Sequence, residues 1–134
     1  MADNMQSELQ RWQQLKQQAV SGEFRMEEGI GDALRLRCQT LVAALEDMKE
    51  GAQALAYLAG YGDLPSAKII QSKFEKKAAG GDSHDPNDSA VARLQQHIEV
   101  VQLMHDTYAA AIGKLESTDE AAGSRMNTLT QEVR

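Results

Sequence analysis

The sequence predicts an all-α fold, an antiparallel helical hairpin of two long helices with additional short helices. Two stretches carry this prediction, because their apolar positions recur in alternating steps of three and four residues, as in helices that pack lengthwise. The later stretch has Val91, Leu94, Ile98, Val101, His105, Tyr108, Ile112 and Leu115, with His105 as its one polar position. The earlier stretch has Cys38, Leu41, Leu45, Met48, Ala52, Leu55 and Ala59. Aromatic residues make up only 4% of the chain, which suits slim helix packing better than a sheet or a large enzyme core.

The first element is a short helix over residues 5–20, whose apolar positions recur at helical spacing. They are Met5, Leu9, Trp12, Leu15 and Ala19. Ser21-Gly22 can end this helix, because glycine adopts the left-handed conformation of a C-terminal cap. We interpret Trp12, the single tryptophan, as a packing anchor on the hairpin rather than as a ligand contact.

The first long helix is predicted over residues 26–59. Its start is open between residues 26 and 32, since Gly29 and Gly31 each weaken a helix by about 1 kcal/mol relative to alanine. Asp32 can instead cap a later start. Two glycines within three residues end the helix and begin a turn. The predicted turn consists of Gly60, Tyr61, Gly62, Asp63, Leu64, Pro65 and Ser66.

A short helix over residues 66–79 and a long helix over residues 86–116 complete the predicted domain, which spans residues 1–117. The short helix carries a basic cluster of Lys68, Lys73, Lys76 and Lys77. We interpret this cluster as a solvated helix surface, and a site for an anionic partner is the alternative. Asp85 followed by Pro86 is typical of the N-cap and the first position of a helix, here the last one. Residues 118–134 are polar with little periodicity, and we expect a flexible C-terminal tail there.

Charge and hydropathy exclude several classes of protein. The 134 residues carry a net charge of −6, which argues against nucleic-acid binding through phosphate contacts. No apolar run approaches the roughly 20 residues that span a bilayer. The N-terminus lacks a basic segment followed by an apolar core, so we expect no cleaved signal peptide. We therefore expect a cytoplasmic protein, or one secreted by a route that needs no such signal.

The chain has no pattern typical of a catalytic, metal or cofactor site. There is no phosphate loop, no nucleophile motif and no convergent carboxylate pair, and the three histidines and one cysteine lack metal-ligand spacing. We expect no enzyme activity, no cofactor and no small-molecule substrate. Cys38 is interpreted as a small buried residue. His105 is interpreted as a partly buried polar residue that sets helix register, with a pH-sensitive contact as the alternative.

Apolar residues beside the two rows leave more surface than a two-helix hairpin can cover. Val100, Met104 and Ala111 widen the later row, and Val42, Ala44 and Leu58 lie beside the earlier one. The helices that carry Trp12 and Phe74 can cover this surplus, but we favour a dimeric four-helix arrangement. The predicted interaction residues are Leu41, Leu45, Met48, Leu55, Leu94, Ile98, Val101, Met104, His105 and Tyr108. On this basis Val101→Asp or Leu45→Asp should abolish assembly.

Four short segments resemble actinobacterial proteins related to the WXG100/ESX family of type VII secretion. They are residues 22–26 (GEFRM), 60–66 (GYGDLPS), 74–78 (FEKKA) and 97–101 (HIEVV), followed by Met104. The resemblance implies a small helical hairpin that pairs with another helical protein and acts as a secreted substrate or its escort. The chain departs from the family by lacking Trp-x-Gly at the turn and by adding residues 66–88.

The export signal of that family, Tyr-x-x-x-Asp/Glu, is also absent. Tyr61, Pro65 and Ile112 stand four residues after the three tyrosines. A partner would therefore have to carry the signal. We expect a non-enzymatic protein that acts by helix–helix contact in type VII secretion, as a homodimer or a heterodimer. The alternative is an intracellular helical adaptor or structural protein unrelated to secretion.

Overall fold

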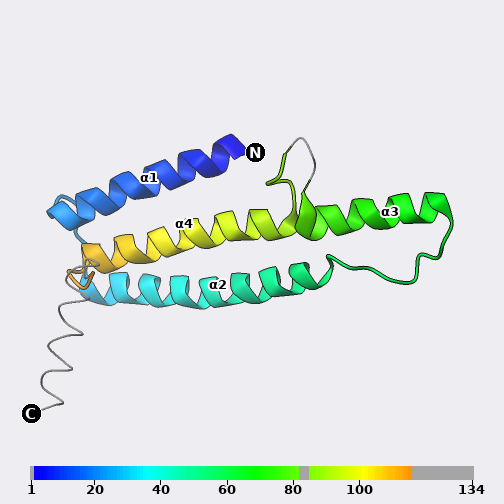
Figure 1. Ribbon diagram of the computed structural model, residues 1–134. Coiled ribbons are helices and arrows are strands. Elements are labelled where there is room, and N and C mark those ends of the chain that lie inside the picture. Colours follow the sequence, from blue (N-terminus) through cyan, green and yellow to red (C-terminus); the bar gives the residue numbers. More distant parts are fainter. Residues whose placement is uncertain (1, 82–84, 116–134) are drawn as a thin grey trace, which may run out of the picture.

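The computed structural model describes residues 2–81 and 85–115, and the predicted C-terminal tail lies outside these ranges. Its helices are α1 (Ala2–Ser21), α2 (Glu28–Ala54), α3 (Pro65–Glu75) and α4 (Ala90–Ala111), with a π-helical turn, η1 (Lys76–Gly80), directly after α3. The described residues contain helices and connections and no strand, which confirms the all-α prediction. Figure 1 shows α4 between α1 and α2, and α3 extending past the end of α2.

Helices α2 and α4 pack along each other in opposite directions (Figure 1). A hydrogen bond joins the side chains of Gln39 and His105, and another joins Lys49 and Gln95, so residue numbers rise along one helix as they fall along the other. The core between them is a cluster of buried apolar side chains, with partly buried ones packed around it. The buried members are Cys38, Leu45, Ile98 and Val101, and the surrounding ones are Val42, Leu94, Met104 and Tyr108.

The predicted row of α2 divides into two in the structure. Cys38, Leu45 and Ala52 are buried, whereas Leu41, Met48 and Leu55 are largely exposed. The position that completes the packing on α4 is Val42, four residues after Cys38, rather than Leu41. Positions 41 and 42 lie about 100° apart around a helix. Because position 42 makes the contact, the face of α2 that packs on α4 is rotated relative to the predicted one. Two parallel rows therefore share α2, and only one of them packs on α4.

Helix α1 packs on α4 through small side chains near the C-terminal ends of both helices. Ala19, Ala110 and Ala111 are buried there, with Phe24, Met26 and Leu115 packed around them. Further along, the rings of Trp12 and Tyr108 meet edge to face with centroids 5.7 Å apart. This geometry stabilises aromatic pairs and agrees with the interpretation of Trp12 as a packing anchor.

Helix α2 begins at Glu28, inside the predicted interval. Glu27 is its N-cap, and its carboxylate accepts hydrogen bonds from the backbone N–H groups of Gly29 and Ile30 at 2.8 and 3.0 Å. These two bonds lower the pKa of Glu27. The cap is therefore fully formed above the ordinary pKa of a glutamate and is lost as the pH falls through the lowered value. Asp32 lies inside the helix and pairs with Arg35 at 2.7 Å.

Helix α1 ends and α3 begins within one residue of the predicted positions, but other helix ends differ by several residues, and α4 ends at Ala111 rather than at 116. Helix α2 ends at Ala54 rather than at 59, and α4 begins at Ala90 rather than at 86. Ser89 caps α4 by accepting a hydrogen bond from the N–H of Ala92, whereas Asp85 accepts one from the N–H of Asn87 in the preceding turn. No helix in the described ranges combines the length and the apolarity that crossing a membrane requires.

Tight packing around η1 sets the direction of α3. Ala78 is buried there, and η1 contacts α3, α2 and α4. Gly81 follows with a φ of +70°, and a Cβ at this glycine would lie 2.6 Å from the carbonyl oxygen of Pro86. Only glycine suits such a position without strain. Helix α3 is therefore held on the end of the α2–α4 pair while the rest of its length projects beyond it (Figure 1).

Candidate protein-interaction surface

An uncovered apolar row runs along α2 beside the face that packs on α4. It consists of Leu41, Ala44, Met48, Gly51 and Leu55, which we call the outer row, and its steps of three and four residues are those of helix-packing surfaces. The large side chains in it, Leu41, Met48 and Leu55, are 45%, 55% and 49% exposed. Among the described elements, α2 packs only on α4 and η1. The outer row is therefore a second packing face without a partner helix in the described part of the chain.

Gly51, the fourth residue of the outer row, is not required by close packing within the described fold. A Cβ at this position would meet nothing within 4 Å. Glycine in a helix interior costs about 1 kcal/mol relative to alanine, so the residue weakens α2 without relieving any crowding. Small residues on a helix surface allow a neighbouring backbone to approach closely. Gly51 and Ala44 thus suit a surface on which another helix lies.

Helix α3 is uncovered along most of its length. None of its residues is buried, and Ile69, Ile70 and Phe74 are about half exposed. It packs on η1 alone among the described helices. The connection before it contributes further contacts, since Leu58 donates its N–H to Glu75 and accepts a hydrogen bond from Gln71. An 11-residue helix with so little cover is marginal in water, so this helix also lacks a packing partner.

The two uncovered surfaces differ in charge. We call α3 and η1 together the arm, and its four lysines, Lys68, Lys73, Lys76 and Lys77, are all exposed, against one acidic residue, Glu75. Asp47 is exposed at one edge of the outer row, and exposed Arg37 lies in line with the row, four residues before Leu41. Lys49 is partly buried and donates a hydrogen bond to Gln95 across the α2–α4 contact. The arm is therefore basic and apolar, whereas the outer row is apolar with one acidic and one basic residue next to it.

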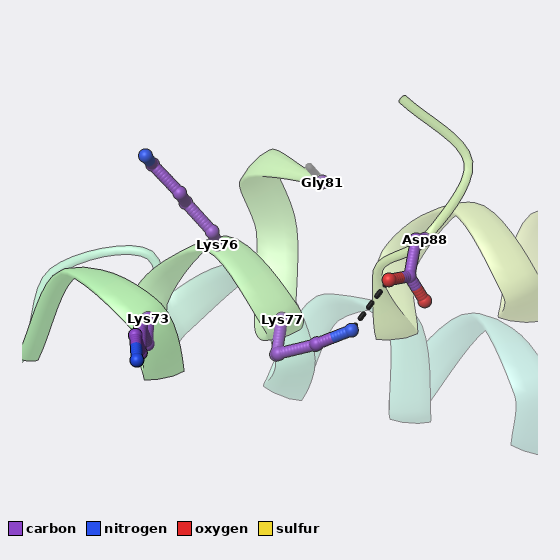
Figure 2. A pocket seen from close by; sticks show the side chains of 5 residues that line it. All are labelled: Lys73, Lys76, Lys77, Gly81 and Asp88. Atoms are coloured by element: carbon purple, nitrogen blue, oxygen red, sulfur yellow. Dashed lines mark hydrogen bonds and ion pairs between the residues drawn. The ribbon is translucent and has the colours of Figure 1, made fainter. Parts of the chain in front are cut away.

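A pocket of about 370 Å³ lies beside the arm, lined by Lys73, Lys76, Lys77, Gly81 and Asp88 (Figure 2). Lys77 forms an ion pair with Asp88. Figure 2 shows that Lys76 extends away from Asp88 and that the three ammonium groups do not converge on one point. An anion would therefore not be bound by all three lysines together, and we interpret the pocket as part of the exposed basic surface.

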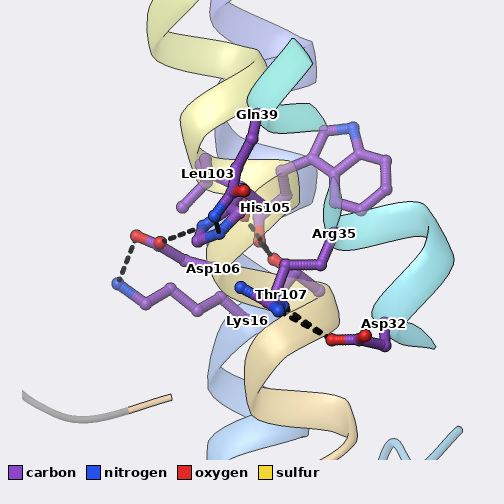
Figure 3. A network of polar contacts seen from close by, with 9 residues as sticks. Lys16, Asp32, Arg35, Gln39, Leu103, His105, Asp106 and Thr107 are labelled. Carbon is purple, nitrogen blue, oxygen red and sulfur yellow. Dashed lines mark hydrogen bonds and ion pairs between the residues drawn. The ribbon is translucent and has the colours of Figure 1, made fainter. Parts of the chain in front are cut away.

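A polar network around His105 joins three helices (Figure 3). The Nδ1 of His105 lies 3.0 Å from an Asp106 carboxylate oxygen, and its Nε2 lies 3.2 Å from the Nε2 of Gln39 on α2. Lys16 on α1 lies 3.8 Å from the other oxygen of Asp106. A ring with its proton on Nδ1 satisfies both contacts, because Gln39 then donates to Nε2. The network links α1 and α2 to α4. His105, which lies at its centre, is thus placed as expected of a residue that sets the register between helices.

Neighbouring buried groups are structural as well. The hydroxyl of Thr107 is fully buried and donates to the carbonyl of Leu103 at 2.7 Å. Cys38 lies in the core, where burial raises the pKa of its thiol, so the reactive thiolate is disfavoured. Within the described ranges, no group of three or more histidine, cysteine, aspartate or glutamate side chains is arranged to hold a metal ion.

The structure distributes the ten predicted interaction residues over two surfaces. Seven lie in or around the α2–α4 core: Leu45, Leu94, Ile98, Val101, Met104, His105 and Tyr108. The remaining three, Leu41, Met48 and Leu55, lie in the outer row. The predicted turn residues from Gly60 to Ser66 form the exposed connection and the first residues of α3. Sequence reasoning missed Gly51 and Ile69, although the outer row has an unbroken spacing of three and four residues that could have indicated the former.

Comparisons of the chain with protein-family models, with curated proteins and with solved structures gave no match. The outer row and the arm are thus the features of the chain from which a function has to be inferred.

Proposed function

We propose that this chain is a protein-interaction module that acts by helix–helix contact and catalyses no reaction. The outer row is the single observation that carries this proposal. Its apolar side chains repeat with the spacing of a helix-packing face, and no described helix covers them. Solvent-exposed apolar rows of this length cost free energy in water and are typical of interaction sites.

The chemistry of the outer row favours a helical partner over an extended peptide. Steps of three and four residues match the side-chain spacing of a helix lying alongside, and Ala44 and Gly51 leave room for its backbone. The arm adds Ile69 and Ile70 as further apolar contacts, each about half exposed. The partner would therefore gain stabilisation by burying its own apolar row against α2 and α3.

We further propose that this contact serves type VII secretion, in which the chain is a secreted substrate or escorts one. Support comes from the segments at 22–26, 60–66, 74–78 and 97–101 that resemble the WXG100/ESX-related proteins. Export can be tested by comparing secreted and cellular fractions of the source cells with and without an active type VII ATPase. Loss of the chain from the secreted fraction without the ATPase is expected. Its restriction to the cytosol in both strains, with no exported partner, would favour the intracellular adaptor instead.

Two leucine substitutions on α2 test the interaction surface. Leu41 and Leu36 are 45% and 47% exposed, but Leu41 belongs to the outer row and Leu36 lies about 140° away around the helix. Leu41→Asp should weaken assembly about tenfold or more, because it places a charge in an apolar contact. Leu36→Asp should leave assembly unchanged. Sedimentation equilibrium on the purified chain, alone and with purified candidate partners, measures both.

Helix content, followed by circular dichroism, should be the same in both variants because neither side chain is buried. If Leu41→Asp and Leu36→Asp assemble as well as the original chain does, the outer row is not an interaction surface and the proposal fails.

A further inference from the structure

The arm carries positive charge in a chain that is otherwise strongly acidic. Its residues, 65–80, include four lysines and one glutamate, a net charge of +3, so the other residues together carry −9 in a chain whose net charge is −6. Three of the lysines, Lys68, Lys73 and Lys76, are exposed and form no ion pair with a described residue. The glutamate, Glu75, is partly buried and accepts a hydrogen bond from the connection before α3. The exposed surface of the arm is therefore basic and favours an anionic partner.

Apolar side chains and a lysine share one broad face of α3. Around the helix, Lys73 lies between Ile69 and Ile70, and Phe74 follows about 40° beyond Ile70. The four side chains are exposed and cover about 140° of the helix surface. Helices that pack lengthwise meet along a narrower row, and a lysine in the middle of this face would be buried in such a contact. A lipid surface suits this face better, because a lysine stem can lie among apolar groups while its ammonium group reaches the phosphates.

The position of the arm keeps α3 away from the acidic helices. η1, with buried Ala78, holds the arm against the end of the α2–α4 pair, and α3 projects beyond that end (Figure 1). The 11 residues of α3 extend over roughly 16 Å, at about 1.5 Å per residue. Charges in water are screened over about 8 Å at physiological ionic strength. Helix α3 can therefore approach an anionic surface without strong repulsion from the rest of the molecule.

We propose that the arm binds the surface of an anionic lipid bilayer, with α3 lying in the plane of the interface. An 11-residue helix is too short to cross a bilayer. Its isoleucines and Phe74 instead enter the boundary between headgroups and acyl chains, and the lysines contact the lipid phosphates. The lipid takes the place that a helical partner would have on α3 and leaves the outer row open to that partner. This inference thus goes beyond the proposed function and does not depend on it.

The arrangement of the lysines favours a lipid surface over other anions. Figure 2 shows that the ammonium groups of Lys73, Lys76 and Lys77 do not converge on one point, as the binding of a single anion would require. Lipid headgroups are spread over a plane and can meet each lysine where it lies. The phosphates of a nucleic acid could also pair with spread lysines, but they would leave Ile69, Ile70 and Phe74 exposed to water.

Co-sedimentation of the purified full chain with lipid vesicles tests this proposal. Vesicles with equal amounts of phosphatidylcholine and phosphatidylglycerol should bind the chain about tenfold or more tightly than vesicles of phosphatidylcholine alone. Binding should weaken as the salt concentration rises. Lys73→Glu combined with Lys76→Glu should weaken binding to the mixed vesicles about tenfold or more. Ile69→Gln combined with Ile70→Gln should also weaken it about tenfold, because glutamine keeps the helix propensity but removes the apolar area that enters the interface.

The matched control is Arg11→Glu combined with Arg25→Glu, which changes the net charge equally at exposed positions outside the arm. It should bind vesicles like the original chain, and circular dichroism checks that all variants keep their helix content. Equal binding to both kinds of vesicle, an unaffected arm variant, or an equal loss in the control would each overturn the proposal. Tighter binding to poly-glutamate or to duplex DNA than to the mixed vesicles would overturn it in favour of another anion. Leu41→Asp should leave vesicle binding unchanged, so failure here is distinguishable from failure of the proposed function.

Discussion

Val101→Asp is expected to unfold the helical core. Val101 is 7% exposed and belongs to the buried cluster with Cys38, Leu45 and Ile98. An aspartate there would be surrounded by apolar atoms, and an unpaired buried charge costs several kcal/mol. Domains of this size are stable by only about 5–15 kcal/mol in total, so most of the helical signal should be lost at 25 °C. Circular dichroism during thermal unfolding measures the loss.

The sequence-based expectation for Val101→Asp and Leu45→Asp was a loss of assembly. Both are buried within one chain, so their substitution by aspartate acts on the fold first. Val101→Ala, which removes two methyl groups, should cost only about 2 kcal/mol and keep a cooperative transition. Leu36→Asp, at an exposed position, should stay within about 0.5 kcal/mol of the original chain. An unchanged melting temperature for Val101→Asp would contradict the placement of Val101 in the core.

The same substitution at two glycines of α2 is expected to have opposite effects. Gly31 is buried, and a Cβ there would lie 2.2 Å from Cγ2 of Ile112. Ile112 is branched at Cβ and can move this atom only by changing its χ1 rotamer, so Gly31→Ala should cost about 1–3 kcal/mol. Gly51 faces open space, so Gly51→Ala should stabilise α2 by up to about 1 kcal/mol.

Chemical denaturation at protein concentrations low enough to keep the chain monomeric measures both changes. The pair controls for the general preference of helices for alanine, because that preference favours alanine equally at both sites. Only the surroundings of the two glycines differ. Two free-energy changes of the same sign would mean that α2 and the end of α4 are not packed as described.

The elements of the fold were largely predictable, because four helical patterns are visible in the sequence. Helix ends were less so. Residues 55–59 continue the apolar spacing of α2, but Leu58 instead forms hydrogen bonds with Gln71 and Glu75 from α3, and this long-range contact leaves no local signal. The π-helical turn at Lys76–Gly80 was not predictable either, since it depends on the packing of Gly81 against Pro86.

The candidate surface was predictable in part. Leu41, Met48 and Leu55 were expected to make contacts between proteins. They were, however, predicted to lie in one row together with Cys38 and Leu45, whereas the structure places them in a separate row. Periodicity alone cannot separate two rows about 40–100° apart on one helix, because both have apolar residues every three or four positions. Which row meets α4 depends on Val42 and on the facing side chains Ile98 and Val101, and therefore on tertiary packing. Likewise, the projection of α3 away from α2 follows from η1 and not from the composition of the arm.

Hydrogen–deuterium exchange at Pro65–Glu75 as a function of protein concentration tests most directly whether the uncovered surface is an interaction site. Helix α3 has no buried residue, so its amides should exchange rapidly when the protein is dilute and monomeric. At concentrations where the chain assembles, these amides should become protected, and the peptides that carry Met48 and Leu55 should be protected with them. Exchange that stays equally fast in the assembled protein, both in α3 and in the peptides that carry Met48 and Leu55, would show that neither the arm nor the outer row contacts a partner and would contradict the central claim.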